Sequence, residues 1–289
     1  NELAAGPSQV MMTTHSAPAL VAAEPATIWY LGQGHVIAEL SSPRSVQLQK
    51  RDPEAFLSRL TLVGEGPTEV GFVGEVLRRE IATDLLDLGV RLSDGQGNTF
   101  TLELLEELTK SKLGLAAFVD CEGDNTARWG NLKSVMGDLL FQWPSGCTEA
   151  NVIAHVPDDK LQALLVDPED VHTQSRLATL VERLKVLVPT AEFPKHDFAT
   201  INAVAGDRLR ALIIAAASGD PDGAPEKQAK TWKKHGKRWF KSLEGGRELA
   251  DKAYALGAMV KVQPQLQPLI DALTALPARA PKATEMADA

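Results

Sequence analysis

The sequence predicts an α/β protein built on a mainly parallel, Rossmann-like sheet with an inserted or appended helical subdomain. Between residues 57 and 150, short apolar runs typical of buried strands alternate with stretches of helical spacing. This alternation implies parallel strands, whose carboxyl ends meet at one edge of the sheet. After residue 150 the patterns are helical, and none favours a strand.

Size, charge and cysteine content limit the class of protein. The chain has 289 residues, which suits one or two domains, and no run of about 18 apolar residues that would span a membrane. Its two cysteines, Cys121 and Cys147, form neither a disulfide framework nor a zinc site, which favours the cytoplasm. The net charge of −8 argues against nucleic-acid binding by the whole surface, but it leaves room for one basic face.

The first 56 residues are predicted to end one domain and to link it to the next. Residues 9–16 have strand character and carry His15 at the tip, a place suited to sensing a nucleotide γ-phosphate, although a lone histidine is more often structural. No GxxxxGK(S/T) loop occurs, so this segment cannot hydrolyse ATP alone. Residues 27–31 and 35–40 predict a hairpin, and polar residues 41–51 predict a linker. The start lacks an initiator Met and a signal pattern, so we expect a piece of a longer protein.

The remaining elements follow from apolar spacing and turn residues. In the central unit we expect strands over 60–63, 90–92, 113–119 and 139–143, and helices over 68–88, 101–110 and from about 125 to 136. Asp124 or Asn125 would cap the last of these helices. Beyond it, amphipathic helices are expected within 158–187 and 200–217, with closing helices over 247–256 and 266–276.

Carboxylates follow three of the four predicted strands. They are Glu65 and Glu69 after the first strand, Asp120, Glu122 and Asp124 after the third, and Glu149 after the fourth. Acids gathered at one edge repel each other in a low-dielectric cleft, and a divalent cation relieves that repulsion. Ligands that are all oxygen favour Mg²⁺ or Mn²⁺. The alternative is a set of ordinary loop acids, with Glu69 complementing a helix dipole.

The acid-bearing motifs resemble those of the Toprim domain. Glu65-Gly66 matches its Glu-Gly motif, and Asp120-Cys121-Glu122 matches its Asp-x-Asp motif with Glu in the last place, so either Glu122 or Asp124 is the second ligand. The run 64–72, GEGPTEVGF, resembles the OLD (overcoming lysogenization defect) family of ATP-dependent endonucleases. Residues 13–16, Thr-Thr-His-Ser, resemble the switch-histidine strand of the ABC-type ATPase domain that precedes Toprim in that family.

This resemblance implies four segments. They are the tail of an ABC-type ATPase domain with a linker over 1–56, a Toprim core over 57–156, a helical insertion over 157–230, and a return to the core with closing helices over 231–289.

Residues 227–241 form a basic segment with seven Lys or Arg residues, no acid, and interleaved aromatics. This composition predicts a nucleic-acid surface made of Lys230, Lys233, Lys234, Lys237 and Arg238. The alternative is a solvated basic helix face whose aromatics pack inward. The sequence around Lys241, Trp-Phe-Lys-Ser-Leu-Glu-Gly-Gly, resembles the late OLD segment that returns a Lys to the metal site, with Lys237 as the runner-up. A cation there would stabilise charge on a phosphate.

The resemblance implies a metal-dependent DNA endonuclease with catalytic Glu65, Asp120 and Lys241 and two Mg²⁺ or Mn²⁺ ions. It also implies ATP use only through an ATPase domain outside this chain, and a homodimeric full protein. The alternatives are a non-catalytic nucleic-acid-binding module and a primase- or topoisomerase-type Toprim enzyme. No zinc motif supports a primase, and neither Tyr30 nor Tyr254 lies in a recognisable topoisomerase motif.

Overall fold

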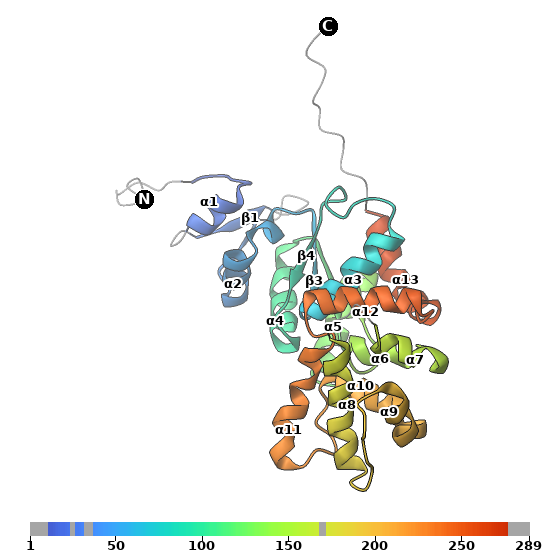
Figure 1. Cartoon of the computed structure of the whole chain (residues 1–289). Coiled ribbons are helices and arrows are strands. Elements are labelled where there is room, and N and C mark those ends of the chain that lie inside the picture. The colour runs from blue at the N-terminus through green and yellow to red at the C-terminus, as the bar shows by residue number, and fades with distance from the viewer. Residues whose placement is uncertain (1–10, 24–26, 32–36, 168–171, 277–289) are drawn as a thin grey trace.

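A four-stranded parallel sheet lies at the centre of the molecule, as the sequence predicts (Figure 1). The computed structural model describes residues 11–23, 27–31, 37–167 and 172–276. The strands are β3 (Leu60–Gly64), β4 (Val90–Asp94), β5 (Leu115–Val119) and β6 (Leu140–Gln142), in the order β4-β3-β5-β6. Each is followed by a helix: α3 (Pro67–Glu80), α4 (Asn98–Leu108), α5 (Thr126–Met136) and α6 (Thr148–Ala154).

Both faces of the sheet are buried, which explains why its strands are apolar runs without polar alternation. Along β5, Phe118 belongs to one hydrophobic cluster, and its neighbours Ala117 and Val119 belong to the other. The Phe118 face is covered by α3 together with α12 (Leu243–Ala255) and α13 (Met259–Thr274), and the opposite face by α4 and α5 (Figure 1). Strand side chains alternate between the two faces, so each layer receives every second residue.

The N-terminal part contains the predicted hairpin and an unpredicted helix. Strands β1 (Trp29–Leu31) and β2 (Ile37–Glu39) pair antiparallel, while residues 32–36 lie outside the described part. Within the predicted linker over 41–51 the chain forms helix α2 (Pro43–Arg51), capped by Ser42 and anchored by buried Leu48. The predicted strand over 9–16 is not formed across residues 11–16, which pair with no described strand and are exposed up to Ser16. Helix α1 (Ala17–Ala22) follows, and residues 9 and 10 lie outside the described part.

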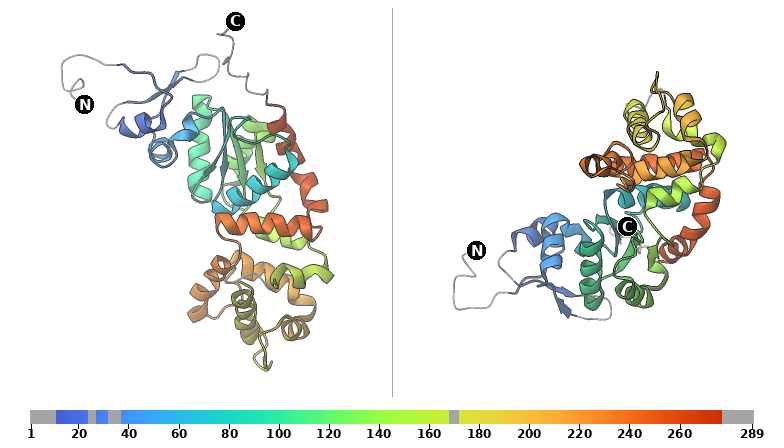
Figure 2. Two further views of the ribbon diagram at one scale, coloured as in Figure 1. Left: turned by 45° about the horizontal axis from the view of Figure 1, so that its top comes forward. Right: turned by 90° about the horizontal axis from the view of Figure 1, so that it is seen from below.

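The chain between residues 158 and 238 forms a helical region, and no strand occurs in its described residues. Its helices are α7 (Leu161–Leu165), α8 (Thr173–Leu187), α9 (Phe198–Ala205), α10 (Leu209–Ser218) and α11 (Glu226–Lys233). In both views of Figure 2 this region lies at the opposite end of the molecule from the N-terminal hairpin. Short 3₁₀ turns lie at Pro53–Phe56, Thr109–Ser111, Gly137–Leu139, Asp158–Lys160, Gly206–Arg208 and His235–Arg238. None of the described helices combines the length and the apolar character needed to cross a membrane.

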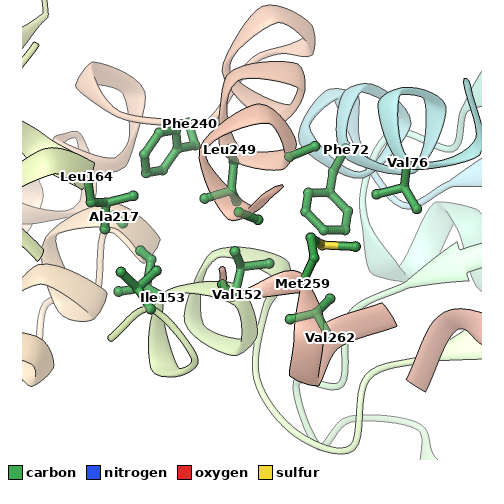
Figure 3. Close-up of a cluster of buried hydrophobic side chains, with 14 of the residues drawn as sticks. Phe72, Val76, Val152, Ile153, Leu164, Ala217, Phe240, Leu249, Met259 and Val262 are labelled. Atoms are coloured by element: carbon green, nitrogen blue, oxygen red, sulfur yellow. The ribbon is translucent and has the colours of Figure 1, made fainter. Parts of the chain in front are cut away.

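One hydrophobic core joins the helical region to the sheet layer (Figure 3). Phe72 of α3 and Met259 of α13 pack at one end of this cluster, and Leu164 and Ala217 of the helical region lie at the other. Because buried apolar side chains connect the two parts without a break, the helical region is fixed to the sheet.

Two helix boundaries differ from their predictions by about two helical turns. Helix α3 ends at Glu80 and not near residue 88, and the chain turns before β4. Helix α13 begins at Met259 and not near residue 266, although Pro264 and Pro268 lie inside it. Proline removes a helical hydrogen bond, so the prediction began the helix late. The buried residues Met259, Val262, Leu266, Leu269, Ile270 and Leu273 recur at helical spacing, and burying them outweighs that loss.

Helices α3 and α12 approach each other through glycine. A Cβ on Gly71 would collide with the carbonyl oxygen of Leu243, and a Cβ on Gly246 would collide with that of Thr68. No other residue type lets the two backbones come this close. This crossing brings the C-terminal helices against the first turn of α3.

Replacing Gly246 by alanine is therefore expected to lower the free energy of unfolding by about 2 kcal/mol or more, because the backbone atoms around it cannot move aside. Gly130 in α5 is the matched control, since a Cβ there meets nothing within 4 Å. Gly130→Ala is expected to stabilise the helix by roughly 0.5–1 kcal/mol. Urea denaturation measures both variants, and a Gly246→Ala variant as stable as wild type would contradict the close approach.

Candidate metal centre

Three acidic side chains converge at the carboxyl edge of the sheet. Glu69 lies in the first turn of α3, Asp120 directly follows β5, and Glu149 lies in the first turn of α6. One carboxylate oxygen of each lies within 4.8 Å of those of the other two. Their exposed fractions are 6%, 5% and 1%, so the group is shielded from water. The sequence predicts all three as metal ligands, and they meet because parallel strands end at one edge.

Asp120 is held in one orientation by the residue that precedes Glu149. The backbone N–H and the hydroxyl of Thr148 donate to Asp120 Oδ1 at 2.9 and 3.0 Å. Nε1 of Trp143 donates to the Thr148 hydroxyl oxygen at 2.9 Å. The Trp143–Thr148 pair therefore fixes one carboxylate oxygen, as hydrogen bonds to the ligand side chains do at metal sites. Sequence reasoning missed both residues, and the position of Thr148 beside Glu149 is the only signal that could have found one of them.

Glu149 is the least satisfied carboxylate of the group. Both of its oxygens are buried, and neither has a hydrogen-bond partner in the described part of the chain. Oε1 lies 3.6 Å from Nζ of Lys241, close enough for an ion pair. A carboxylate removed from water without replacement bonds is costly. The three side chains can hold a metal ion, and their oxygen ligands fit a hard divalent cation.

The other three predicted ligands occupy different positions. Glu65 is buried, and its Oε2 accepts hydrogen bonds from the Asp120 backbone N–H at 3.2 Å and from Asn98 Nδ2 at 3.1 Å. Glu122 and Asp124 are exposed and lie outside the three-acid group. The pKa of Glu65 is raised by burial and, to a lesser extent, by the charge of Glu122. Glu122 is therefore near enough to Glu65 to affect its charge. The choice between Glu122 and Asp124 stays a prediction.

Burial and mutual repulsion favour the protonated forms of these acids. Burial, followed by the charge of Glu149, raises the pKa of Glu69 to about 7. Burial, followed by the charges of Glu69 and Glu65, raises the pKa of Asp120 to about 9. In the absence of a cation the group therefore retains protons near neutral pH, and a bound cation would replace them.

Lys241 lies beside the acids, whereas the other charged residues of the basic segment face solvent. Burial works against the charged form of Lys241, but the charges of Glu149, Glu69 and Asp120 outweigh it and raise its pKa. The ammonium is therefore retained at neutral pH. The nucleic-acid-binding residues predicted in the basic segment are all exposed: Lys230, Lys233, Lys234, Lys237 and Arg238.

The aromatic residues of the basic segment lie in the interior. Trp232, Trp239 and Phe240 are no more than 3% exposed, so they have no free face for stacking on bases. The segment therefore offers charge alone to a ligand. His15, the predicted nucleotide sensor, is exposed in the N-terminal part.

Comparisons of this chain with protein-family models, with curated proteins and with solved structures find no match.

Asparagine in place of Asp120 is expected to stabilise the metal-free protein increasingly as pH rises from 5 to 8. The pKa of Asp120 is about 9 in the folded state against 3.8 ordinarily, so the folded state keeps a proton that the unfolded chain releases. The stability from this group is complete below about pH 4 and is lost as pH rises toward 9. The D120N variant lacks this titration, so its free energy of unfolding relative to wild type should change by more than about 1 kcal/mol.

Urea denaturation in EDTA at both pH values measures that change. Asp138 is exposed, so D138N provides a control that should follow wild type. An equal pH dependence in D120N and D138N would contradict the raised pKa of Asp120.

Valine in place of Thr148 is expected to weaken Mn²⁺ binding by about tenfold or more, because Asp120 loses the hydroxyl that orients it. T148S keeps the hydroxyl and should bind as wild type does. Isothermal titration calorimetry gives both dissociation constants, and an unchanged value for T148V would show that the hydroxyl has no positioning role.

Proposed function

We propose that this chain is the nuclease region of an OLD-like ATP-dependent endonuclease and that it hydrolyses phosphodiester bonds in DNA with a divalent cation. The observation that carries this proposal is Glu149, whose carboxylate is buried beside two further acids, faces Lys241 and has no hydrogen-bond partner among the described residues. A cation held by acids beside a fixed ammonium suits a substrate that is itself an anion, such as a phosphodiester.

Each residue of the site has a role in this proposal. Glu69, Asp120 and Glu149 would hold a Mg²⁺ or Mn²⁺ ion, which when bound supplies Lewis-acid polarisation of a phosphoryl oxygen and a more acidic water. Lys241 would stabilise negative charge that develops on the phosphate. Glu65 supports the backbone of Asp120 through its hydrogen bond to the N–H. A second ion, which the resemblance implies, would draw on Glu65 with Glu122 or Asp124.

The topology supports the Toprim interpretation of the core. The Glu65-Gly66 motif follows the central strand β3, and Asp120 follows its neighbour β5. The two motifs therefore lie on adjacent strand ends, which is what the family resemblance requires of them. The motifs alone do not distinguish hydrolysis from phosphodiester transfer, and the tyrosines bear on that choice.

A topoisomerase is disfavoured by the position of Tyr254. Its hydroxyl donates to Glu80 Oε1 at 2.6 Å, at the end of α3 opposite to Glu69. Glu80 lies eleven positions after Glu69 in the same helix, a rise of roughly 16 Å. This tyrosine is therefore remote from the acids and is engaged in another bond.

The exposed basic residues supply the DNA-binding surface in this proposal. Lys233, Lys234, Lys237 and Arg238 lie on α11 and the following turn, directly before Lys241 in the chain. Their charges would neutralise backbone phosphates, so binding is expected to weaken steeply with salt. Since no aromatic side chain of the segment is exposed, binding is expected to be insensitive to base sequence.

Glutamine in place of Glu149 is expected to reduce Mn²⁺-dependent nicking of supercoiled plasmid by at least about 100-fold, and to remove the Mn²⁺-induced rise in Tm. Exposed Glu226, in α11, provides the control variant E226Q, which should lose neither property. A wild-type protein that binds Mn²⁺ but never nicks DNA would be the non-catalytic module. A protein with no divalent-dependent Tm shift would not contain the proposed metal site.

A further inference from the structure

Lys241 reaches the acids from the helical region and not from the sheet. It ends a short segment, His235–Lys241, that leads from α11 to α12. Its backbone N–H is directed at the carbonyl oxygen of Gly236 at 3.4 Å, and its Nζ lies 3.6 Å from Glu149 Oε1. The backbone of Gly236 and the ammonium of Lys241 are therefore parts of one compact turn.

His235 anchors the start of this turn inside the helical region. The ring is fully buried, and Arg183 Nε of α8 donates to its Nδ1 at 3.1 Å. A guanidinium can only donate, so Nδ1 carries no proton, and Nε2 donates to Glu182 Oε2 at 2.8 Å. Burial lowers the pKa of His235 against the opposing effect of Glu182, which favours this neutral ring. Both ring nitrogens are thus occupied by partners from one helix.

Gly236 transmits that anchoring to the lysine side chain. A Cβ on Gly236 would lie 2.9 Å from the Ala217 carbonyl oxygen of α10 and 2.9 Å from Cδ and Cε of Lys241. The methylene stem of Lys241 therefore runs across the Gly236 backbone, which is itself pressed against α10. A side chain at position 236 would press on both, so the flexible lysine stem would have to move aside and the turn would have to shift slightly away from α10.

Two further bonds fix the backbone between Gly236 and Lys241. Nε1 of Trp239 donates to Thr179 Oγ1 at 3.0 Å, and the Thr68 hydroxyl donates to the Phe240 carbonyl oxygen at 3.1 Å. Phe240 itself lies in the core that joins the sheet layer to the helical region (Figure 3). These bonds place the backbone of the turn, whereas the contact with Gly236 sets the course of the Lys241 stem.

We propose that His235 and Gly236 are positioning residues that set the Lys241 ammonium against Glu149, so that the helical region controls the charge balance of the acidic group. The inference rests on the proposed function only in taking this group as the site of the chemistry. The geometry of the turn is independent of any metal. Motion of α8 or α10 would move the ammonium, because both helices hold the turn.

The reactivity of Lys241 in metal-free protein tests this directly. In the wild type the Lys241 stem lies across Gly236 and its ammonium lies against buried Glu149, so a displaced side chain is more accessible to a reagent and is acylated faster. Lys241 is acetylated with an amine-reactive acetyl ester, and mass spectrometry follows the rate. We expect Gly236→Ala to raise this rate several-fold. Exposed Lys261 on α13 serves as an internal reference, and Gly130→Ala is the control variant. An unchanged rate at Lys241 in Gly236→Ala would overturn the proposal.

Variants of His235 separate positioning from general destabilisation. His235→Leu removes the hydrogen bonds of the ring to Arg183 and Glu182, and it should also accelerate acylation of Lys241. His235→Asn keeps an acceptor near the place of Nδ1 for Arg183 and should restore a nearly wild-type rate. Equal acylation rates in folded His235→Leu and His235→Asn would reject the role of the Arg183 bond. If His235→Leu does not fold, as judged by circular dichroism, Gly236→Ala decides alone.

A double-mutant cycle with Mn²⁺ then connects the turn to the metal site. Lys241 competes with a cation for Glu149, so K241Q should raise Mn²⁺ affinity by about five- to tenfold. Gly236→Ala should do nearly the same, and the double variant should gain nothing further. Additive effects would overturn the inference. If no folded variant binds Mn²⁺, the proposed function fails, and the acylation rates still decide the positioning role.

Discussion

Burying Glu69, Asp120 and Glu149 together is the constraint on which the structure of this site depends. Charged carboxylates lose hydration at the sheet edge and repel one another, so each needs a compensating partner. Asp120 has the two donors of Thr148, Glu149 has the ammonium of Lys241, and raised pKa values allow Glu69 and Asp120 to hold protons. This compensation is incomplete, because both oxygens of Glu149 still lack a hydrogen bond among the described residues. A divalent cation would satisfy all three acids at once, and the proposed metal site rests on this need.

The compensating groups come from widely separated parts of the chain. Thr148 belongs to the helix that carries Glu149, whereas Lys241 comes from the turn that leads from α11 to α12. The same turn that delivers Lys241 exposes Lys237 and Arg238 to solvent. Arg238 also lies 3.9 Å from Glu182, the acid that holds His235. A polyanion bound to this surface would therefore contact Arg238. Arg238 pairs with Glu182, and Glu182 in turn accepts the hydrogen bond of His235, which anchors the turn of Lys241.

Local patterns were sufficient for the sheet and for the placement of its acids. The strands were predictable because β3 and β5 are apolar on both faces, and Glu69, Asp120 and Glu149 follow from the rule that parallel strands end together. The sequence predicts too late a start for helix α13, because local rules treat Pro264 and Pro268 as helix breakers and do not take account of the apolar surface that the helix buries. The His235–Arg183 bond joins residues 52 positions apart and leaves no periodic signal. Lys241 was found through motif resemblance, since no spacing rule links it to Glu149.

The glycine-mediated crossing of α3 and α12 also has a consequence for biosynthesis. Thr68 of α3 bonds to a carbonyl 172 residues later, so the side of α3 that carries Thr68 and Gly71 is covered only after the C-terminal helices have left the ribosome. A nascent chain would hold the strands and the acids long before this cover exists. Such long-range closure slows folding and leaves apolar surface accessible in the meantime. The layer that covers this side of the sheet is therefore completed only after α12 and α13 have been synthesised.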